Sequence, residues 1–455
     1  MLGGVGVVSD GGGLVVKSFV DWVVVGLLVC ASLLTAVIHV PQHQTISPLD
    51  EYVYIDYLAK VPTQGVVRRG EMTGDYARNV AACRGFRFVA SLPRELCGSV
   101  ATSPDDAFPM GGTNSAYVYT PLYFAATWVM AQPLRWFGVN DLVTAGRATG
   151  WVWLAAAAVL LYLSLRRLKV RPFLGCGLCL LMVGSLGAYW GNTYISTDAT
   201  AYFSGALMLW MLLRFLRRRY HGVGLLAAVA VVVTLLKFQN YGAVVVVAMF
   251  LLVYSGQEWG FVHGEGSWGR RFVRWVRDPR FSAAVIIAGV PLVAQAVWLV
   301  IQNLISIGPA ENQGISSPLT IKALVSEAFN FFTGPIMSSA DPQLGALIVL
   351  VLGSVSAWVI VSGVLGSAVV EERGSVGEAL ALSSFAVALL FGPALAIATR
   401  LSAGIYFDLP LRYGMSLVPF FIACAGLLYL RKQWVGGCVA VACIGCYALS
   451  LAITG

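Results

Sequence analysis

Residues 19–40 read FVDWVVVGLLVCASLLTAVIHV, and this apolar run is followed by others of similar length along the chain. A helix needs about 20 consecutive apolar residues to cross the ~30 Å hydrocarbon layer of a bilayer. The pattern therefore predicts an all-α membrane protein with about eleven transmembrane helices. The expected spans are 19–40, 143–165, 173–191, 199–216, 222–236, 240–255, 282–301, 343–365, 377–398, 414–430 and 433–453.

The composition agrees with a membrane protein. Of the 455 residues, 58% are hydrophobic and only 11% are charged, whereas a soluble domain carries about 25% charged residues. So few charges cannot cover a surface that faces water. The formal net charge of +8 fits basic residues in short cytoplasmic loops that set the orientation. We therefore expect no nucleic-acid partner.

Segment 117–137 decides the topology, because it is apolar enough to be considered a span. If it does not span, the three most basic stretches, 166–171, 214–219 and 270–280, all become cytoplasmic. Lysine and arginine are enriched in cytoplasmic loops, which favours this arrangement. We expect 117–137 to form helices in the membrane interface, where aromatic residues prefer to lie.

This topology divides the chain into parts. We expect a cytoplasmic N-terminal tail (1–18), a transmembrane core (19–301) that includes a long extracytoplasmic loop (41–142), a second extracytoplasmic loop (302–342), and C-terminal transmembrane helices (343–455). The protein is then a multi-pass protein of the cell membrane. Because the cytoplasmic loops are short and basic, any active site is expected on the extracytoplasmic side.

Two cysteines, Cys83 and Cys97, lie in the first long loop, outside the apolar runs. If that loop faces an oxidising compartment, they can form a disulfide.

Adjacent carboxylates, Asp50 and Glu51, follow the first expected span after ten residues. One interpretation is structural: Asp50 caps a helix, and the helix dipole favours Glu51 in the first turn. The other is chemical, because partial desolvation at a membrane surface makes a carboxylate a better general base. Taken alone, the pair leaves both interpretations open.

Further charged residues are expected on the same face. Lys237 ends a short apolar span and can snorkel to the interface or hold a phosphate. Arg412, beside Tyr413, can anchor a helix or bind a lipid phosphate. Asp198, in a short outer turn, can be a helix cap or an active-site acid. With Asp50, this set meets the electrostatic demand of sugar transfer from a phosphate-linked lipid: a base for the acceptor and cations for the leaving phosphate.

The order of these motifs resembles the GT-C superfamily of polytopic glycosyltransferases, which use polyprenyl-phosphate sugars and include protein mannosyltransferases and the lipid A aminoarabinose transferase. The resemblance covers most of the chain. The matching pieces are Pro48-Leu-Asp-Glu51 with Tyr54, Thr120-Pro-Leu-Tyr-Phe124, Phe137-Gly-Val-Asn-Asp141 with Arg147, Asp198, Leu236-Lys237, and Arg412-Tyr413 with Pro419. Two departures are Thr120, where the family has proline, and Phe-Gln-Asn after Lys237.

The resemblance implies a GT-C-like core with interfacial helices in the first loop. It also implies transfer of a sugar from a polyprenyl-phosphate donor to an acceptor hydroxyl, with inversion. The implied roles are Asp50 as base with Glu51 as second candidate, Lys237, Arg412 and Tyr413 at the donor phosphate, and Tyr54, Asp198 and Tyr123 at the acceptor or the cavity. The implied partners are the lipid-linked sugar, a glycan, lipid or protein acceptor, and membrane lipids.

No cofactor is certain from the sequence. The histidines and cysteines are not spaced as a metal site. Some relatives use a divalent cation, and Asp50, Glu51 and Asp198 could offer oxygen ligands to Mg²⁺ or Mn²⁺.

Two other functions stay open at this point. A polytopic transporter places charged residues at the bilayer midplane, in broken helices or between repeat halves. A non-catalytic, lipid-binding scaffold would turn Asp50 into the protein as a satisfied cap, with no cavity beside it. The positions of the acids and of any cavity distinguish the three functions.

Overall fold

The computed structural model describes residues 18–48, 50–87, 96–259, 267–309, 316–337 and 346–453. Every regular element among these residues is helical, as the apolar patterning predicts. Of the expected N-terminal tail, only Ser18 lies within the described residues. Its side chain caps the first helix by accepting a hydrogen bond from the backbone N–H of Asp21.

The α-helices are α1 (Phe19–His39), α2 (Glu51–Gln64), α3 (Asp75–Arg84), α4 (Leu122–Trp136), α5 (Leu142–Ala148), α6 (Gly150–Arg167), α7 (Pro172–Val183), α8 (Leu186–Thr193), α9 (Ala201–Arg217), α10 (Val223–Leu236), α11 (Tyr241–Glu258), α12 (Trp268–Val276), α13 (Pro279–Leu304), α14 (Ile321–Met337), α15 (Ala346–Val370), α16 (Val376–Ala403), α17 (Val418–Tyr429) and α18 (Gln433–Ser450). The 3₁₀-helices are η1 (Val40–Gln42), η3 (Val100–Thr102), η4 (Asp105–Ala107), η5 (Pro109–Gly112), η6 (Ser115–Val118), η7 (Thr197–Thr200), η8 (Phe238–Asn240) and η9 (Leu411–Leu417).

Nine helical segments of the described chain are long and apolar enough to cross a membrane, which confirms a polytopic helical protein. They are Phe19–Gln42, Leu142–Arg167, Thr197–Arg217, Phe238–Glu258, Pro279–Leu304, Leu347–Val370, Val376–Leu401, Leu411–Tyr429 and Gln433–Ser450. The expected span 173–191 is a pair of helices, α7 and α8, bent by 60°. The expected span 222–236 corresponds to α10, whose 14 residues reach only about 21 Å. The full count of about eleven stays a prediction.

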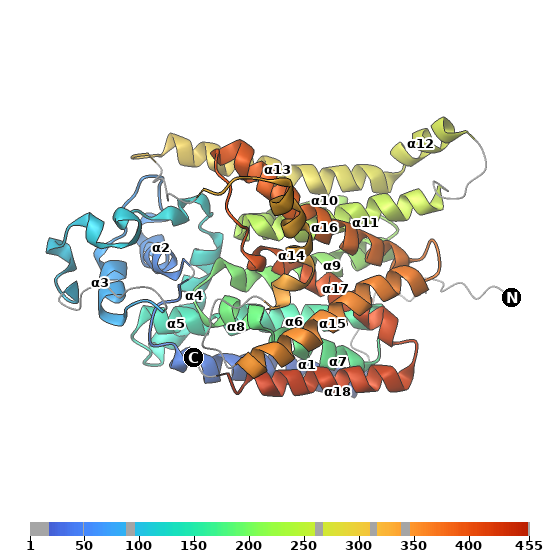
Figure 1. Cartoon of the computed structure of the whole chain (residues 1–455), viewed down its shortest axis with the longest axis horizontal. Coiled ribbons are helices and arrows are strands. Elements are labelled where there is room, and N and C mark those ends of the chain that lie inside the picture. The colour runs from blue at the N-terminus through green and yellow to red at the C-terminus, as the bar shows by residue number, and fades with distance from the viewer. Residues whose placement is uncertain are drawn as a thin grey trace.

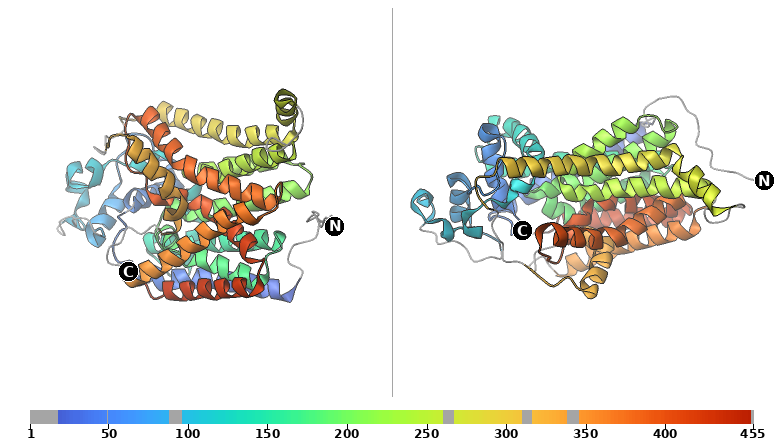
Figure 2. Two further views of the ribbon diagram at one scale, coloured as in Figure 1. Left: turned by 45° about the vertical axis from the view of Figure 1, so that its right-hand side comes forward. Right: turned by 90° about the horizontal axis from the view of Figure 1, so that it is seen from above.

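The helices of the first loop, α2 to α4, lie at one end of the molecule together with α5, which begins the span Leu142–Arg167. Figure 1 shows α2 to α5 at one end of the bundle and α12 at the opposite end, and the views in Figure 2 keep this separation. Segment 117–137, expected to form interfacial helices, contains α4. The ring of Tyr57 on α2 stacks on Phe124 of α4, with centroids 4.0 Å apart. The first loop is thus a packed layer of helices over the end of the bundle.

The expected second loop, 302–342, contains a helix, α14, that was not predicted from the sequence. Its Glu327 is buried and accepts hydrogen bonds from the Tyr406 hydroxyl (2.9 Å) and from the backbone N–H of Leu409 (2.8 Å). Burial raises the pKa of the Glu327 carboxyl. Through these contacts, α14 holds the chain segment that leads into η9.

The two most enclosed spans meet at the centre of the bundle. In both Thr197–Arg217 and Leu411–Tyr429, 72% of the apolar stretch is buried, against 22% for Pro279–Leu304. At Gly205, α9 approaches η9 so closely that a β-carbon would lie 2.2 Å from the carbonyl oxygen of Ser416. Only glycine fits at this contact, and its small size sets how closely α9 and η9 approach each other.

Replacement of Gly205 by alanine should therefore destabilise the protein by about 1–3 kcal/mol, the usual cost of overpacking a core. The measurement is the melting temperature of the purified protein in detergent. Gly224→Ala is the matched control, because Gly224 lies in α10 with no atom within 4 Å of the added β-carbon. Alanine there should be neutral or slightly stabilising. Equal melting temperatures for the two variants would contradict the close approach at Gly205.

Candidate active site

Asp50 occupies the N-cap position of α2, but its side chain makes no capping hydrogen bond. Its backbone is left-handed, with φ at 59°, a conformation that non-glycine residues adopt rarely and at a cost in energy. The carboxylate instead faces Arg412, whose Nη2 lies 3.0 Å from Oδ2 of Asp50. The local backbone thus presents this carboxylate to an ion pair and not to the helix end.

Arg412 joins two carboxylates that are far apart in the sequence. Its Nη2 contacts Asp50, and its Nε lies 3.3 Å from Oδ2 of Asp198. Arg412 belongs to η9 and Asp198 to η7, and these short helices precede the two central spans α17 and α9. The Asp50 side chain is 36% exposed, whereas those of Arg412 and Asp198 are 14% and 6% exposed. Asp50 is therefore the open end of this set of charges.

Lys237 lies at the closed end. Its Nζ donates a hydrogen bond to Oδ1 of Asp198 and lies 5.2 Å from the ring centroid of Tyr413. The Lys237 side chain is only 2% exposed. Asp50, Arg412, Asp198 and Lys237 thus alternate in sign and sum to zero. Mutual pairing of this kind is what allows charged side chains to persist in an apolar bundle. We call these four residues the charge chain.

A cavity of about 240 Å³ adjoins the open end of the charge chain. Its wall is formed by Asp50, Val53, Tyr54, Thr113, Ser115, Tyr117, Val118, Tyr119, Phe407 and Tyr413. Asp50 carries the single carboxylate among these lining residues. Burial raises the pKa of Tyr54 and of Tyr119 far above the usual range, so both phenols stay protonated. The cavity therefore presents one carboxylate among neutral hydroxyl groups and aromatic rings.

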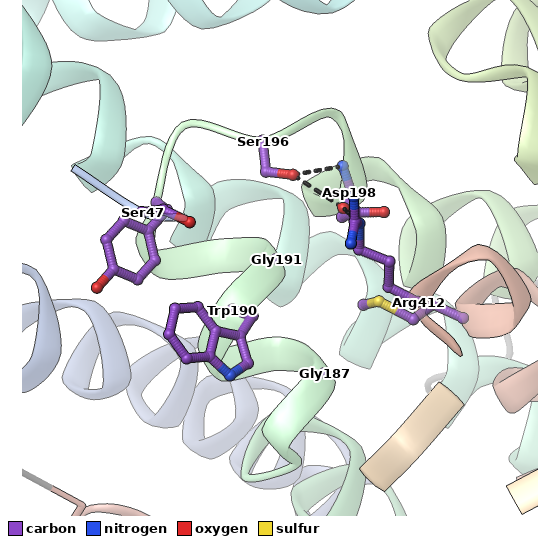
Figure 3. Close-up of a pocket in the computed structure, with 9 residues that line it drawn as sticks. Ser47, Gly187, Trp190, Gly191, Ser196, Asp198 and Arg412 are labelled. Carbon is purple, nitrogen blue, oxygen red and sulfur yellow. Dashed lines mark hydrogen bonds and ion pairs between the residues drawn. The ribbon is translucent and has the colours of Figure 1, made fainter. Parts of the chain in front are cut away.

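A much smaller space lies beside Asp198 and Arg412, with a volume of about 10 Å³. Figure 3 shows Ser196 at this space, where its Oγ donates to Oδ2 of Asp198 at 3.0 Å and accepts from the Asp198 backbone N–H at 3.1 Å. The indole Nε1 of Trp190, which also lines the space, is buried without a hydrogen-bond partner among the described residues. The volume suits one water molecule and excludes a sugar.

Glu51 does not line the cavity and forms a fully buried ion pair with Arg147. Nε and Nη2 of Arg147 each lie 2.8 Å from a carboxylate oxygen of Glu51. The backbone N–H groups of Ser47 and Ile195 also donate to Glu51, at 2.8 Å and 3.0 Å. Because all four contacts occupy its oxygens, the structure does not support Glu51 as a second candidate base. We interpret Glu51 as a positioning residue that ties the start of α2 to α5.

Arg147 belongs to one of the motifs that resemble the GT-C family, but no role was predicted for it from the sequence. An arginine among the apolar residues of an expected span needs an acidic partner, and this signal could have linked it to Glu51.

His43 is a second buried residue near the site that was not predicted from the sequence. It is buried, stacks on Tyr194 with ring centroids 3.9 Å apart, and contacts the Thr193 hydroxyl at 2.8 Å. Burial, followed by the nearby Arg147 charge, lowers the pKa of His43 to about 2, so this imidazole is neutral.

The remaining expected residues divide into two groups. Tyr54 and Tyr413 line the cavity with Asp50. Tyr123 does not line it; the residue is buried, and its hydroxyl accepts a hydrogen bond from the backbone N–H of Ser196 at 3.0 Å, which supports the turn before Asp198.

Cys83, at the end of α3, forms a disulfide with Cys97, with the α-carbons 4.8 Å apart.

The residues named as ligands for a divalent cation do not gather into one site. Glu51 is paired with Arg147, and Asp198 is paired with Lys237 and Arg412. Within the described part of the chain, no group of three or more histidine, cysteine or acidic side chains is arranged to hold a metal ion.

A comparison with models of known protein families finds no match to this chain, and a comparison with curated protein sequences finds none either. The resemblance to GT-C enzymes therefore rests on the motifs quoted above, and the function that it implies is a proposal.

Replacement of Glu51 by glutamine should destabilise the protein by about 3 kcal/mol or more, because it leaves the charge of Arg147 buried without a partner. The measurement is again the melting temperature in detergent. Glu371→Gln is the matched control: Glu371 pairs with Arg431 at 3.0 Å, but the arginine side chain is 40% exposed, and such surface pairs contribute about 1 kcal/mol or less. If both variants have the melting temperature of the parent protein, the ion pair between Glu51 and Arg147 does not stabilise the fold around the site.

Proposed function

We propose that the protein is a membrane glycosyltransferase that moves a sugar from a polyprenyl-phosphate donor to an acceptor hydroxyl. One observation carries the proposal. The carboxylate of Asp50 stands in the wall of a cavity of about 240 Å³, in contact with Arg412, at the end of an apolar helix bundle. A lipid-linked donor can keep its polyprenyl chain in the bilayer while its phosphate and sugar reach such a cavity.

In the proposed reaction, Asp50 is the general base. An oxygen of its carboxylate takes the proton of the acceptor hydroxyl as the hydroxyl oxygen bonds to the anomeric carbon of the sugar. The bond from that carbon to the phosphate oxygen breaks, and its electron pair leaves with the polyprenyl phosphate. Direct displacement of this kind inverts the anomeric configuration. The neutral phenols of Tyr54 and Tyr119 offer hydrogen bonds to sugar hydroxyl groups without competing for the proton.

Arg412 is the proposed phosphate contact. A guanidinium group matches a phosphate through two parallel hydrogen bonds, and Arg412 already contacts the one carboxylate of the cavity wall. When the donor phosphate accepts a hydrogen bond from Nη2 of Arg412, it replaces the Asp50 carboxylate at that atom. The carboxylate then has no cationic partner and becomes available as a base. Donor binding would thus free the Asp50 carboxylate to deprotonate the acceptor hydroxyl.

In this proposal Lys237 does not contact the donor phosphate itself, as was expected from the sequence, but acts on it through Asp198 and Arg412. Lys237 is buried behind Asp198 and does not line the cavity. Its positive charge holds Asp198 in place, and Asp198 in turn orients Arg412 through the 3.3 Å contact. We therefore propose Lys237 and Asp198 as positioning residues for Arg412, and Tyr413 as an aromatic wall of the donor site.

The positions of the acids favour an enzyme over the two alternatives. A transporter site is expected near the bilayer midplane, whereas Asp50 follows the end of α1 and Asp198 precedes α9. A scaffold with a satisfied cap at Asp50 is disfavoured, because this side chain makes no capping bond and borders a cavity.

Asp50→Asn should lower sugar transfer by at least about 100-fold, because a positioned base contributes this much or more, while the protein level stays normal. Transfer is measured in membranes that contain the protein, with a panel of radiolabelled polyprenyl-phosphate hexoses and pentoses. Asp105→Asn is the matched control, since Asp105 lies in the same loop with a side chain that is 59% exposed, pairs with Arg78 and does not line the cavity. It should retain parental transfer.

Near-normal transfer by Asp50→Asn would rule out this residue as the base. Absence of transfer by the parent protein with every donor of the panel would contradict the proposed function itself.

A further inference from the structure

Helix α12 has two chemically distinct faces. Positions four residues apart lie on the same side of a helix, which groups the apolar residues Trp268, Phe272 and Val276 on one side. The same spacing places Arg270 and Arg274 together on the opposite side. A short helix with aromatic residues on one face and arginines on the other is typical of elements that lie in a membrane interface.

The apolar face of α12 is not covered by the described part of the protein. Trp268 is 63% exposed, Phe272 is 40% exposed and Val276 is 38% exposed. Figure 1 shows α12 turning away from α13, at the end of the bundle opposite α2 to α5. The helix ends at Val276, and the membrane-spanning segment Pro279–Leu304 begins three residues later. This connection places α12 at the boundary of the bilayer.

The basic face is equally without a partner in the described chain. Arg270, Arg274 and Arg277 are all exposed, and none of the three forms an ion pair with a described residue. Basic residues near an anionic membrane surface each contribute to attraction, and guanidinium groups bind phosphate through paired hydrogen bonds. Lipid phosphates are thus complementary to this face in charge and in geometry.

The orientation of α12 is fixed by contacts at its C-terminal end. The indole N–H of Trp275 donates to the Ser255 hydroxyl on α11 at 2.9 Å. Just beyond the helix, Asp278 accepts hydrogen bonds from Trp259 Nε1 at 2.8 Å and from Arg280 Nη2 at 2.6 Å. These contacts join the end of α12 to α11 and to the start of α13. They therefore fix the orientation of the two faces of α12 relative to the bundle.

We propose that α12 is a docking element for anionic phospholipids in the leaflet at this end of the bundle. Trp268, Phe272 and Val276 enter the acyl-chain region, and Arg270, Arg274 and Arg277 contact the lipid phosphates. The proposal does not depend on the glycosyltransferase assignment, since α12 lies at the end of the molecule opposite the cavity.

The test uses the full-length protein in nanodiscs of phosphatidylcholine alone, and of phosphatidylcholine with an equal amount of phosphatidylglycerol. Hydrogen exchange of peptides covering α12 is measured in both. Exchange should be about tenfold slower with the anionic lipid, and the double substitution Arg270→Gln and Arg274→Gln should abolish the difference. The control, Arg217→Gln with Arg218→Gln, removes the same charge from the exposed end of α9 and should keep the difference.

The proposal would be overturned by equal exchange in the two bilayers, by loss of the difference in the control variant, or by the same slowing with inorganic phosphate in phosphatidylcholine nanodiscs. If the Arg270 and Arg274 variant does not fold, the parent protein still gives a decision. High salt screens contacts with lipid headgroups, so the anionic-lipid effect should disappear at 1 M salt. Persistence of the effect would exclude the electrostatic contact proposed here.

Discussion

Arg412 contacts Asp50 and Asp198 at once, and both carboxylates lie more than 200 residues before it in the sequence. In an apolar bundle a charge is stable only beside a partner. The requirement fixes the relative places of the loop before α2, the turn before α9 and the segment before α17. The same pairing leaves Asp50 as the exposed end, next to a cavity. The structural role of the charge chain and its proposed chemical role therefore depend on one arginine.

The residues around the charge chain are held in place by close packing and buried ion pairs. The buried pair of Glu51 and Arg147 holds the start of α2, where the left-handed backbone of Asp50 turns the carboxylate toward Arg412. The close approach at Gly205 fixes α9 against η9. A donor phosphate that replaces Asp50 at Arg412 would meet a site whose other parts are already in place, and preorganised sites of this kind stabilise charge at low cost in reorganisation.

Much of the bundle could be predicted from the sequence, because long apolar runs have few other uses. The α7–α8 bend and helix α14 were harder to predict, since Gly184-Ser185 is weak evidence for a bend and α14 lies in a stretch expected to be a loop. Within the site, the residue types and their common face were predicted. The partners were not: Glu51 and Asp50 are adjacent in sequence, yet one pairs with Arg147 and the other with Arg412. Such long-range pairing depends on helix packing, which local patterns do not encode.

In the proposed reaction, Arg412 exchanges the Asp50 carboxylate for the donor phosphate. The most direct test is an experimental structure of the protein with polyprenyl phosphate bound. We expect phosphate density in contact with the Arg412 guanidinium, and an Asp50 carboxylate that has separated from Arg412 and faces the cavity lined by Tyr54 and Tyr413. Phosphate bound elsewhere, with the contact between Asp50 and Arg412 intact, would contradict the proposed exchange.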